Sequence, residues 1–90
     1  MTSVVIRHRI TDMTTLITVL ASDHATRRAY GELHYAVFQN ATNPEDVMIV
    51  LEWDDPHRAQ LYAQSDDAQR MLARTGLADP VHLSVLRNNG

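Results

Sequence analysis

The chain has 90 residues, of which 44% are hydrophobic and 21% are charged. This balance is typical of globular proteins, so we expect one folded domain over residues 1–90 and exclude a disordered tail, a collagen-like repeat and a coiled coil. The chain has no cysteine and a net charge of −3. These two facts exclude disulfide scaffolds and iron–sulfur clusters, and they argue against nucleic acid as a partner.

Segments for export or membrane insertion are not visible in the sequence. The longest apolar runs, such as residues 47–51, are far shorter than the roughly 18 residues that cross a bilayer. The first four residues carry no basic side chain, unlike the start of a secretory signal. We therefore expect no membrane partner and a cytoplasmic location, which the absence of cysteine also fits.

The first half of the chain predicts a strand, a helix and a second strand. Residues 3–10 are rich in β-branched side chains and alternate in polarity, as strands do. Asp12 is suited to cap a helix with a 3.6-residue apolar period, which we expect to break near Asp23. A further helical turn ends where Gly31 can adopt the left-handed conformation. Residues 32–39 alternate again and predict the second strand.

The second half predicts a strand, a helix and a strand in the same order. After a polar loop, residues 47–53 form an apolar strand. Asp55 precedes a proline, which is the pattern of a helix N-cap followed by its first residue. The helix can restart near Ser65 and is expected to end at Gly76. Residues 81–87 alternate as the fourth strand, after Pro80.

The element order βαββαβ is that of the ferredoxin-like α+β fold, a four-stranded antiparallel sheet with two helices on one face. Two helices cover only one side of such a sheet. Residues 47–53 are nevertheless apolar on both faces except at Glu52. We therefore expect a second subunit to cover the other face, which makes the protein a homodimer.

Several short motifs carry a resemblance to a known family. They are residues 27–32, residues 52–55, the trio Ala59, Tyr62 and Ser65, and Gly76 followed by Pro80. With these motifs the chain resembles the antibiotic biosynthesis monooxygenase-like family of the dimeric α/β-barrel superfamily. The resemblance implies a pocket between sheet and helices. Activities in the family range from cofactor-independent oxygenation of polyketide-type phenols to haem degradation.

The haem-degrading branch does not fit this sequence. By resemblance, that branch needs an Asn in the first strand and a Trp and a His in the second helix. The matching positions here hold His8, Tyr62 and Leu72, and leucine cannot ligate iron. The five histidines also lack the close pair spacings of metal ligands. We therefore expect neither a cofactor nor a metal.

His8 is the candidate catalytic residue. It shares the apolar side of the first strand with Val4, Ile6 and Ile10, and a neutral imidazole there can accept a proton from a phenol. The alternative is a core histidine whose ring nitrogens are satisfied by the protein.

Four further residues are candidates for binding a substrate. His34 and His82 lie on the second and fourth strands, where the strand register decides whether they share a face with His8. Trp53 and Tyr62 flank the start of the second helix and could form an aromatic pocket wall, or simply pack in the core.

Two arginines of the first strand also allow two interpretations. Arg7 and Arg9 share a face and could bind an anionic substrate. Alternatively they pair with acids such as Glu52, across strands or at the subunit interface.

The sequence thus predicts a cofactor-independent monooxygenase, or a related cyclase or isomerase, acting on an aromatic or polyketide-like small molecule. The alternative is a non-catalytic dimeric α/β-barrel protein that binds a ligand or responds to stress, with structural histidines.

Overall fold

The computed structural model describes residues 1–76 and 82–89, and at His82 it describes the backbone alone. Four strands and four helices lie within these residues. Their bounds are β1 (Thr2–Arg9), α1 (Met13–Ser22), α2 (His24–Ala29), β2 (His34–Gln39), β3 (Asp46–Trp53), α3 (Pro56–Ala63), α4 (Asp66–Arg74) and β4 (His82–Arg87).

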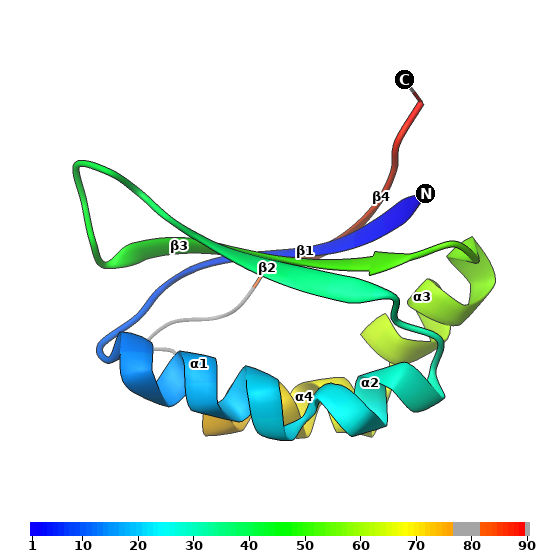
Figure 1. Ribbon diagram of the computed structural model, residues 1–90, viewed down its shortest axis with the longest axis horizontal. Coiled ribbons are helices and arrows are strands. Elements are labelled where there is room, and N and C mark those ends of the chain that lie inside the picture. Colours follow the sequence, from blue (N-terminus) through cyan, green and yellow to red (C-terminus); the bar gives the residue numbers. More distant parts are fainter. Residues whose placement is uncertain (77–81, 90) are drawn as a thin grey trace.

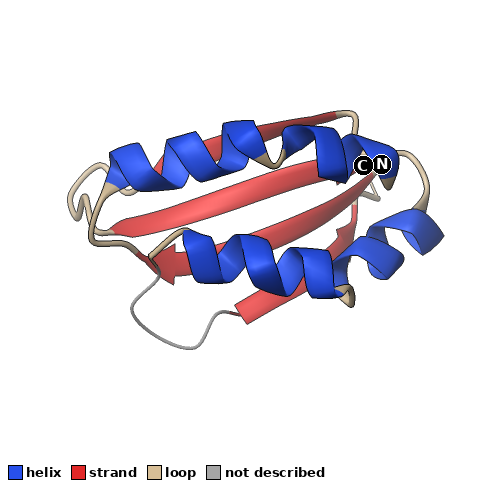
Figure 2. Ribbon diagram, turned by 90° about the horizontal axis from the view of Figure 1, so that it is seen from below, coloured by secondary structure: helices blue, strands red, loops and turns tan. Residues whose placement is uncertain are grey.

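The four strands form one antiparallel sheet in the order β2-β3-β1-β4. All the helices lie on the same side of this sheet (Figure 1). They run as two rows, α1 with α2 and α3 with α4, as Figure 2 shows from below. The predicted ferredoxin-like α+β arrangement is therefore confirmed, with each predicted helix divided into two segments.

The first helical row begins and breaks where the sequence predicts. Asp12 accepts hydrogen bonds from the Thr15 hydroxyl at 2.8 Å and the Thr14 amide at 3.0 Å, and these donors lower the pKa of the Asp12 carboxyl. The break falls at Asp23, between α1 and α2. After α2, Gly31 has φ +102°, a left-handed conformation that a residue with a Cβ adopts only with strain.

The second helical row is capped twice. Asp55 accepts from the His57 amide at 2.9 Å, which starts α3. Ser65 accepts from the Ala68 amide at 3.1 Å, which starts α4. Gly76 follows with φ +71°. Both predicted helix starts and the predicted stop are confirmed.

The strands agree with the predicted ranges except at their ends. β2 begins at His34, two residues after its predicted start, because the side chain of Glu32 is buried beneath the sheet instead of joining it. The Leu33 amide still donates to the Glu52 carbonyl at 2.8 Å. For the fourth strand, Pro80 and Val81 lie outside the described residues.

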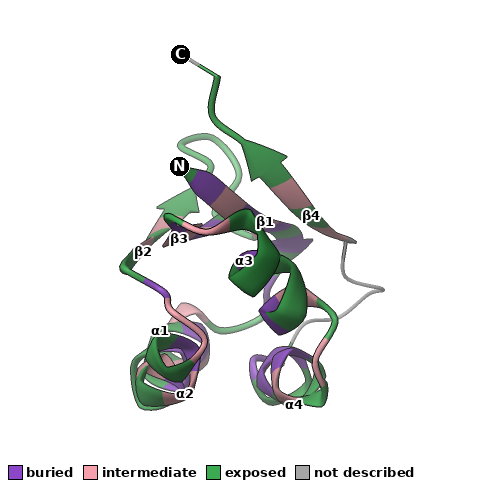
Figure 3. Cartoon of the chain, turned by 90° about the vertical axis from the view of Figure 1, so that its right-hand side faces the viewer, coloured by how far each residue is buried: buried purple, intermediate pink, exposed green. Residues whose placement is uncertain are grey.

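The core lies between the sheet and the helices. Figure 3 shows buried positions on β1, on β3 and on the inner sides of the helices. The largest contributions come from aliphatic side chains of the two central strands, α1 and α4, together with one tryptophan and one tyrosine. The fully buried members include Val4, Ile6, Leu16, Leu20, Ile49, Leu51, Trp53, Tyr62 and Met71. This packing fixes which side of each strand faces the helices.

The opposite side of the sheet, which we call the open face, lacks such a cover within one chain. Phe38, Met48 and Leu86 are 53%, 37% and 52% exposed, and Val5 and Val50 between them are only partly buried. The apolar character predicted for both sides of residues 47–53 is therefore present, but a single chain buries only one side.

Candidate functional site

His8 lies on β1 with its side chain toward the helices, next to Val47 of β3 in the register. It is 7% exposed. Its Nδ1 lies 2.6 Å from the carbonyl oxygen of Arg9. A carbonyl can only accept, so Nδ1 carries the hydrogen in the neutral ring and Nε2 carries the lone pair. Among aliphatic neighbours such as Ile6 and Ile10, this ring is oriented as a proton acceptor.

The aromatic pair Trp53 and Tyr62 lies at the other end of the same face. Trp53 pairs with Thr2 in the register, six residues along β1 from His8. Six residues correspond to about 20 Å of strand. The two rings stack at 5.5 Å between centroids, and both residues are 0% exposed. The structure therefore joins Trp53 to Tyr62 but does not bring His8 to them.

Tyr62 is tied into a polar group beneath the sheet. Its hydroxyl donates to Asp23 Oδ2 at 3.3 Å and lies 3.4 Å from the sulfur of Met71. Burial, and then the negative charge of Asp23, raises the pKa of the Tyr62 hydroxyl above its ordinary value. Trp53 donates from Nε1 to the Tyr30 carbonyl at 3.0 Å. Each polar handle of the pair thus has a partner within the protein.

Arg27 is the centre of this polar group and is 0% exposed. It donates from Nε to Glu32 at 2.6 Å and from Nη1 to Asp23 at 3.3 Å. Its Nη2 donates to the Leu20 carbonyl at 2.9 Å, and its guanidinium lies 4.7 Å from the ring centroid of Tyr35. We call Asp23, Arg27 and Glu32 the Arg27 clamp.

The clamp is the part of the molecule that sequence reasoning missed. Two of its members, Asp23 and Arg27, are spaced i, i+4, which is the one local signal available. His24 extends it to the surface, since its Nδ1 donates to the second oxygen of Glu32 at 2.8 Å. Since its donors and acceptors are engaged with one another, the clamp ties α1, α2 and the start of β2 together.

His34 and His82 occupy register positions of the open face. His34 pairs with Glu52 and His82 with Arg7, whereas His8 belongs to the alternate set that faces the helices. His34 is exposed. The register therefore separates these two positions from His8, which the sequence could not decide.

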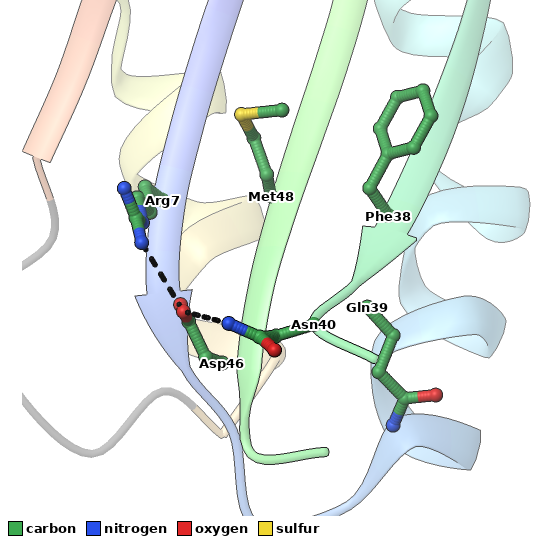
Figure 4. Close-up of a pocket in the computed structure, with 6 residues that line it drawn as sticks. All are labelled: Arg7, Phe38, Gln39, Asn40, Asp46 and Met48. Carbon is green, nitrogen blue, oxygen red and sulfur yellow. Dashed lines mark hydrogen bonds and ion pairs between the residues drawn. The ribbon is translucent and has the colours of Figure 1, made fainter. Parts of the chain in front are cut away.

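The open face also carries a hollow of about 260 Å³. Its lining combines an ion pair with exposed apolar side chains (Figure 4). The lining residues are Arg7, Phe38, Gln39, Asn40, Asp46 and Met48. Arg7 donates to Asp46 at 3.2 Å, as does Asn40, and these contacts lower the pKa of the Asp46 carboxyl.

Two searches of the described residues returned nothing. Residues 1–76 and 82–89 contain no group of three or more histidine, aspartate or glutamate side chains arranged to hold a metal ion. In the same part of the chain, no helix has the length and hydropathy needed to span a membrane.

No protein-family model matches the chain, and no curated protein matches its sequence. Solved structures do match. A conserved protein from Methanosarcina mazei has a TM-score of 0.74 and 19% identity, with 98% of this chain and 92% of that chain covered. A Bordetella bronchiseptica protein, provisionally named an antibiotic biosynthesis monooxygenase, has a TM-score of 0.77 and 15% identity over 97% and 95%.

A third solved structure is named for an activity. It is a variant of SnoaB from Streptomyces nogalater, described as a cofactor-independent oxygenase, with a TM-score of 0.74 and 13% identity over 99% of this chain and 93% of that one. Identities at this level establish a shared fold rather than a shared reaction. The chain therefore has the ferredoxin-like fold of the antibiotic biosynthesis monooxygenase-like proteins, as its sequence resemblance implied.

Proposed function

We propose that the protein is a cofactor-independent oxygenase of an aromatic or polyketide-like phenol, with His8 as the proton acceptor. The observation that carries this proposal is the orientation of the His8 ring. The Arg9 carbonyl holds Nδ1 at 2.6 Å, which leaves the basic lone pair on Nε2. The similarity to a structure named as a cofactor-independent oxygenase supports the same class of reaction.

The reaction needs only a base, the substrate and dioxygen. His8 Nε2 accepts the phenolic proton, and the anion delocalises its charge onto a ring or methylene carbon. One electron passes from this carbanion to dioxygen, and the two radicals combine to form a C–O bond. The resulting peroxide takes up a proton and loses water, so a CH₂ group and O₂ become C=O and H₂O. The aliphatic surroundings of His8 favour the step because they disfavour a charged imidazolium in the resting state.

The test is oxygen uptake with a panel of phenols and hydroquinones, each offered with and without dioxygen. We expect wild-type turnover that depends on oxygen and loss of at least about 100-fold in His8→Ala, the usual contribution of a general base. His57→Ala is the matched control, because His57 is an exposed histidine on α3. Equal activity in His8→Ala and wild type would reject the assignment of His8.

We further propose that the protein is a homodimer joined through the open face. The support is the contiguous apolar surface formed by Phe38, Met48, Val50, Val5 and Leu86 across all four strands. Stable dimers bury such surfaces against one another. Sedimentation equilibrium at micromolar concentration checks this, and a monomeric mass would contradict it.

The alternative, a dimeric protein that binds a ligand without turnover, is favoured by a different observation. Trp53 and Tyr62 are fully buried and stacked on each other, so these aromatic side chains fill the core. If no member of the phenol panel consumes oxygen but one of them raises the melting temperature, the binding function replaces the oxygenase.

A further inference from the structure

The open face has charges of opposite sign at its two ends. The register divides this face into three rows that cross the strands. The middle row holds Val5 and Val50, with Ala36 and Ser84 beside them. Arg7 lies in the row toward the β2–β3 hairpin, and Glu52 lies in the row on the other side.

These two charges cannot meet within one chain. Arg7 is opposite Met48, and Glu52 is opposite Ser3, four residues along β1. Four residues of strand span about 13 Å. Arg7 instead pairs with Asp46 at 3.2 Å, with 71% of its side chain exposed, and Glu52 accepts from the Ser3 hydroxyl at 2.9 Å. Any measured coupling between Arg7 and Glu52 must therefore pass between two molecules.

Two open faces can stack about a two-fold axis in two simple ways. If the axis runs along the strands, each row covers the same row of the partner, and like charges gather: Arg7 beside the partner's Arg7, Glu52 beside the partner's Glu52. If the axis runs across the strands, the Arg7 row covers the Glu52 row. Only this second arrangement places opposite charges next to each other at both ends of the interface.

We propose that the two copies stack about an axis across the strands, so that each Arg7 pairs with the partner's Glu52. This inference rests on the homodimer proposed above and adds its orientation. Arg7 can keep its contact with Asp46, because a guanidinium has five N–H donors. Stacked sheets lie about 10 Å apart, a gap that an arginine and a glutamate extending toward each other can close. Val5 and Val50 then pack at the centre, between the two ion pairs.

The test uses two charge reversals and their mixture. In the Arg7→Glu homodimer both contacts become acid against acid, and in the Glu52→Arg homodimer both become base against base. In a 1:1 mixture the two chains complement each other, since the glutamates of one meet the arginines of the other. We expect each variant alone to dimerise at least about 10-fold more weakly than wild type, and the mixture to recover wild-type dimerisation, by sedimentation equilibrium.

Arg9→Glu mixed with Glu52→Arg is the matched control. Arg9 has the same side chain, 68% exposed, but lies one row further out and pairs with Glu45, so this mixture should not recover. The neutral variants Arg7→Gln and Glu52→Gln repeat the test at lower stress on folding, and each should weaken the dimer less than the reversal does.

The outcomes separate this inference from the proposal beneath it. A wild-type dimer whose two reversals do not complement each other overturns the orientation and leaves the homodimer standing. A monomeric wild type overturns both. Recovery in the Arg7 mixture but not in the Arg9 mixture supports the orientation, and this recovery should weaken as salt is added, because salt screens the ion pairs.

Discussion

The two ends of the helix-covered face use polar side chains in different ways. At one end, the Arg27 clamp and the Trp53–Tyr62 stack satisfy each other's hydrogen bonds within the protein. At the other end, a single imidazole is oriented by a backbone carbonyl among aliphatic neighbours. A polar group whose donors and acceptors are engaged holds elements together, whereas an oriented base among apolar side chains is suited to chemistry. We therefore assign structure to the first end and reactivity to the second.

The largest expected effect breaks the clamp. Arg27→Met leaves Glu32 and Asp23 buried without their cation, and removing one partner of a buried ion pair costs about 3–5 kcal/mol. Urea denaturation measures this loss. Arg28→Met is the control, because the neighbouring arginine is exposed and surface substitutions change stability by less than about 0.5 kcal/mol. A loss below that level for Arg27→Met would mean that the clamp does not stabilise the fold.

A smaller effect follows from removing the Tyr62 hydroxyl. Tyr62→Phe keeps the stacked ring but deletes the bond to Asp23, at a cost of about 1 kcal/mol near neutral pH. The pKa of Tyr62 is raised in the folded protein above the ordinary value of 10.0. The folded state therefore binds this proton more tightly, so its stabilising contribution is complete below pH 10.0 and is lost as the pH rises further.

Alkaline denaturation checks the sign of this linkage. Wild type should lose stability more steeply than Tyr62→Phe above pH 10.0, because only wild type carries the hydroxyl whose pKa is raised on folding. Parallel curves for the two proteins would show that Tyr62 ionises as readily in the folded state as in the unfolded one.

The smallest effect concerns the helix that carries Tyr62 over the clamp. Asp55→Ala removes the N-cap of α3, whose carboxylate accepts from the His57 amide, at a cost of about 1 kcal/mol or less. Asp54→Ala is the matched control, since the adjacent aspartate is exposed and lies outside the helix. Equal denaturation midpoints for the two variants would place the stabilisation of α3 elsewhere.

Features that depend on neighbouring residues could be read from the sequence. The caps Asp12 and Asp55, the break at Asp23 and the left-handed Gly31 each follow from local backbone chemistry, and the structure has them all. These signals, with the apolar periods between them, were enough to predict the fold.

Features that depend on strand register could not be read in the same way. One residue of register decides whether His34 faces the helices or the open face. The separation of His8 from Trp53 follows from their pairing with Val47 and Thr2, not from any local pattern. The pairing of Arg27 with Glu32 likewise depends on how α2 turns into β2, so the clamp emerged only from the structure.

The most direct test of the division between the two ends is oxygen uptake by His8→Ala beside Tyr62→Phe, on the first phenol or hydroquinone that wild type oxidises. The account predicts that His8→Ala loses at least about 100-fold in rate while it remains folded, and that Tyr62→Phe keeps most of its rate despite its lower stability. Loss of activity in Tyr62→Phe with full activity in His8→Ala would contradict it and would move the reactive site to the clamp.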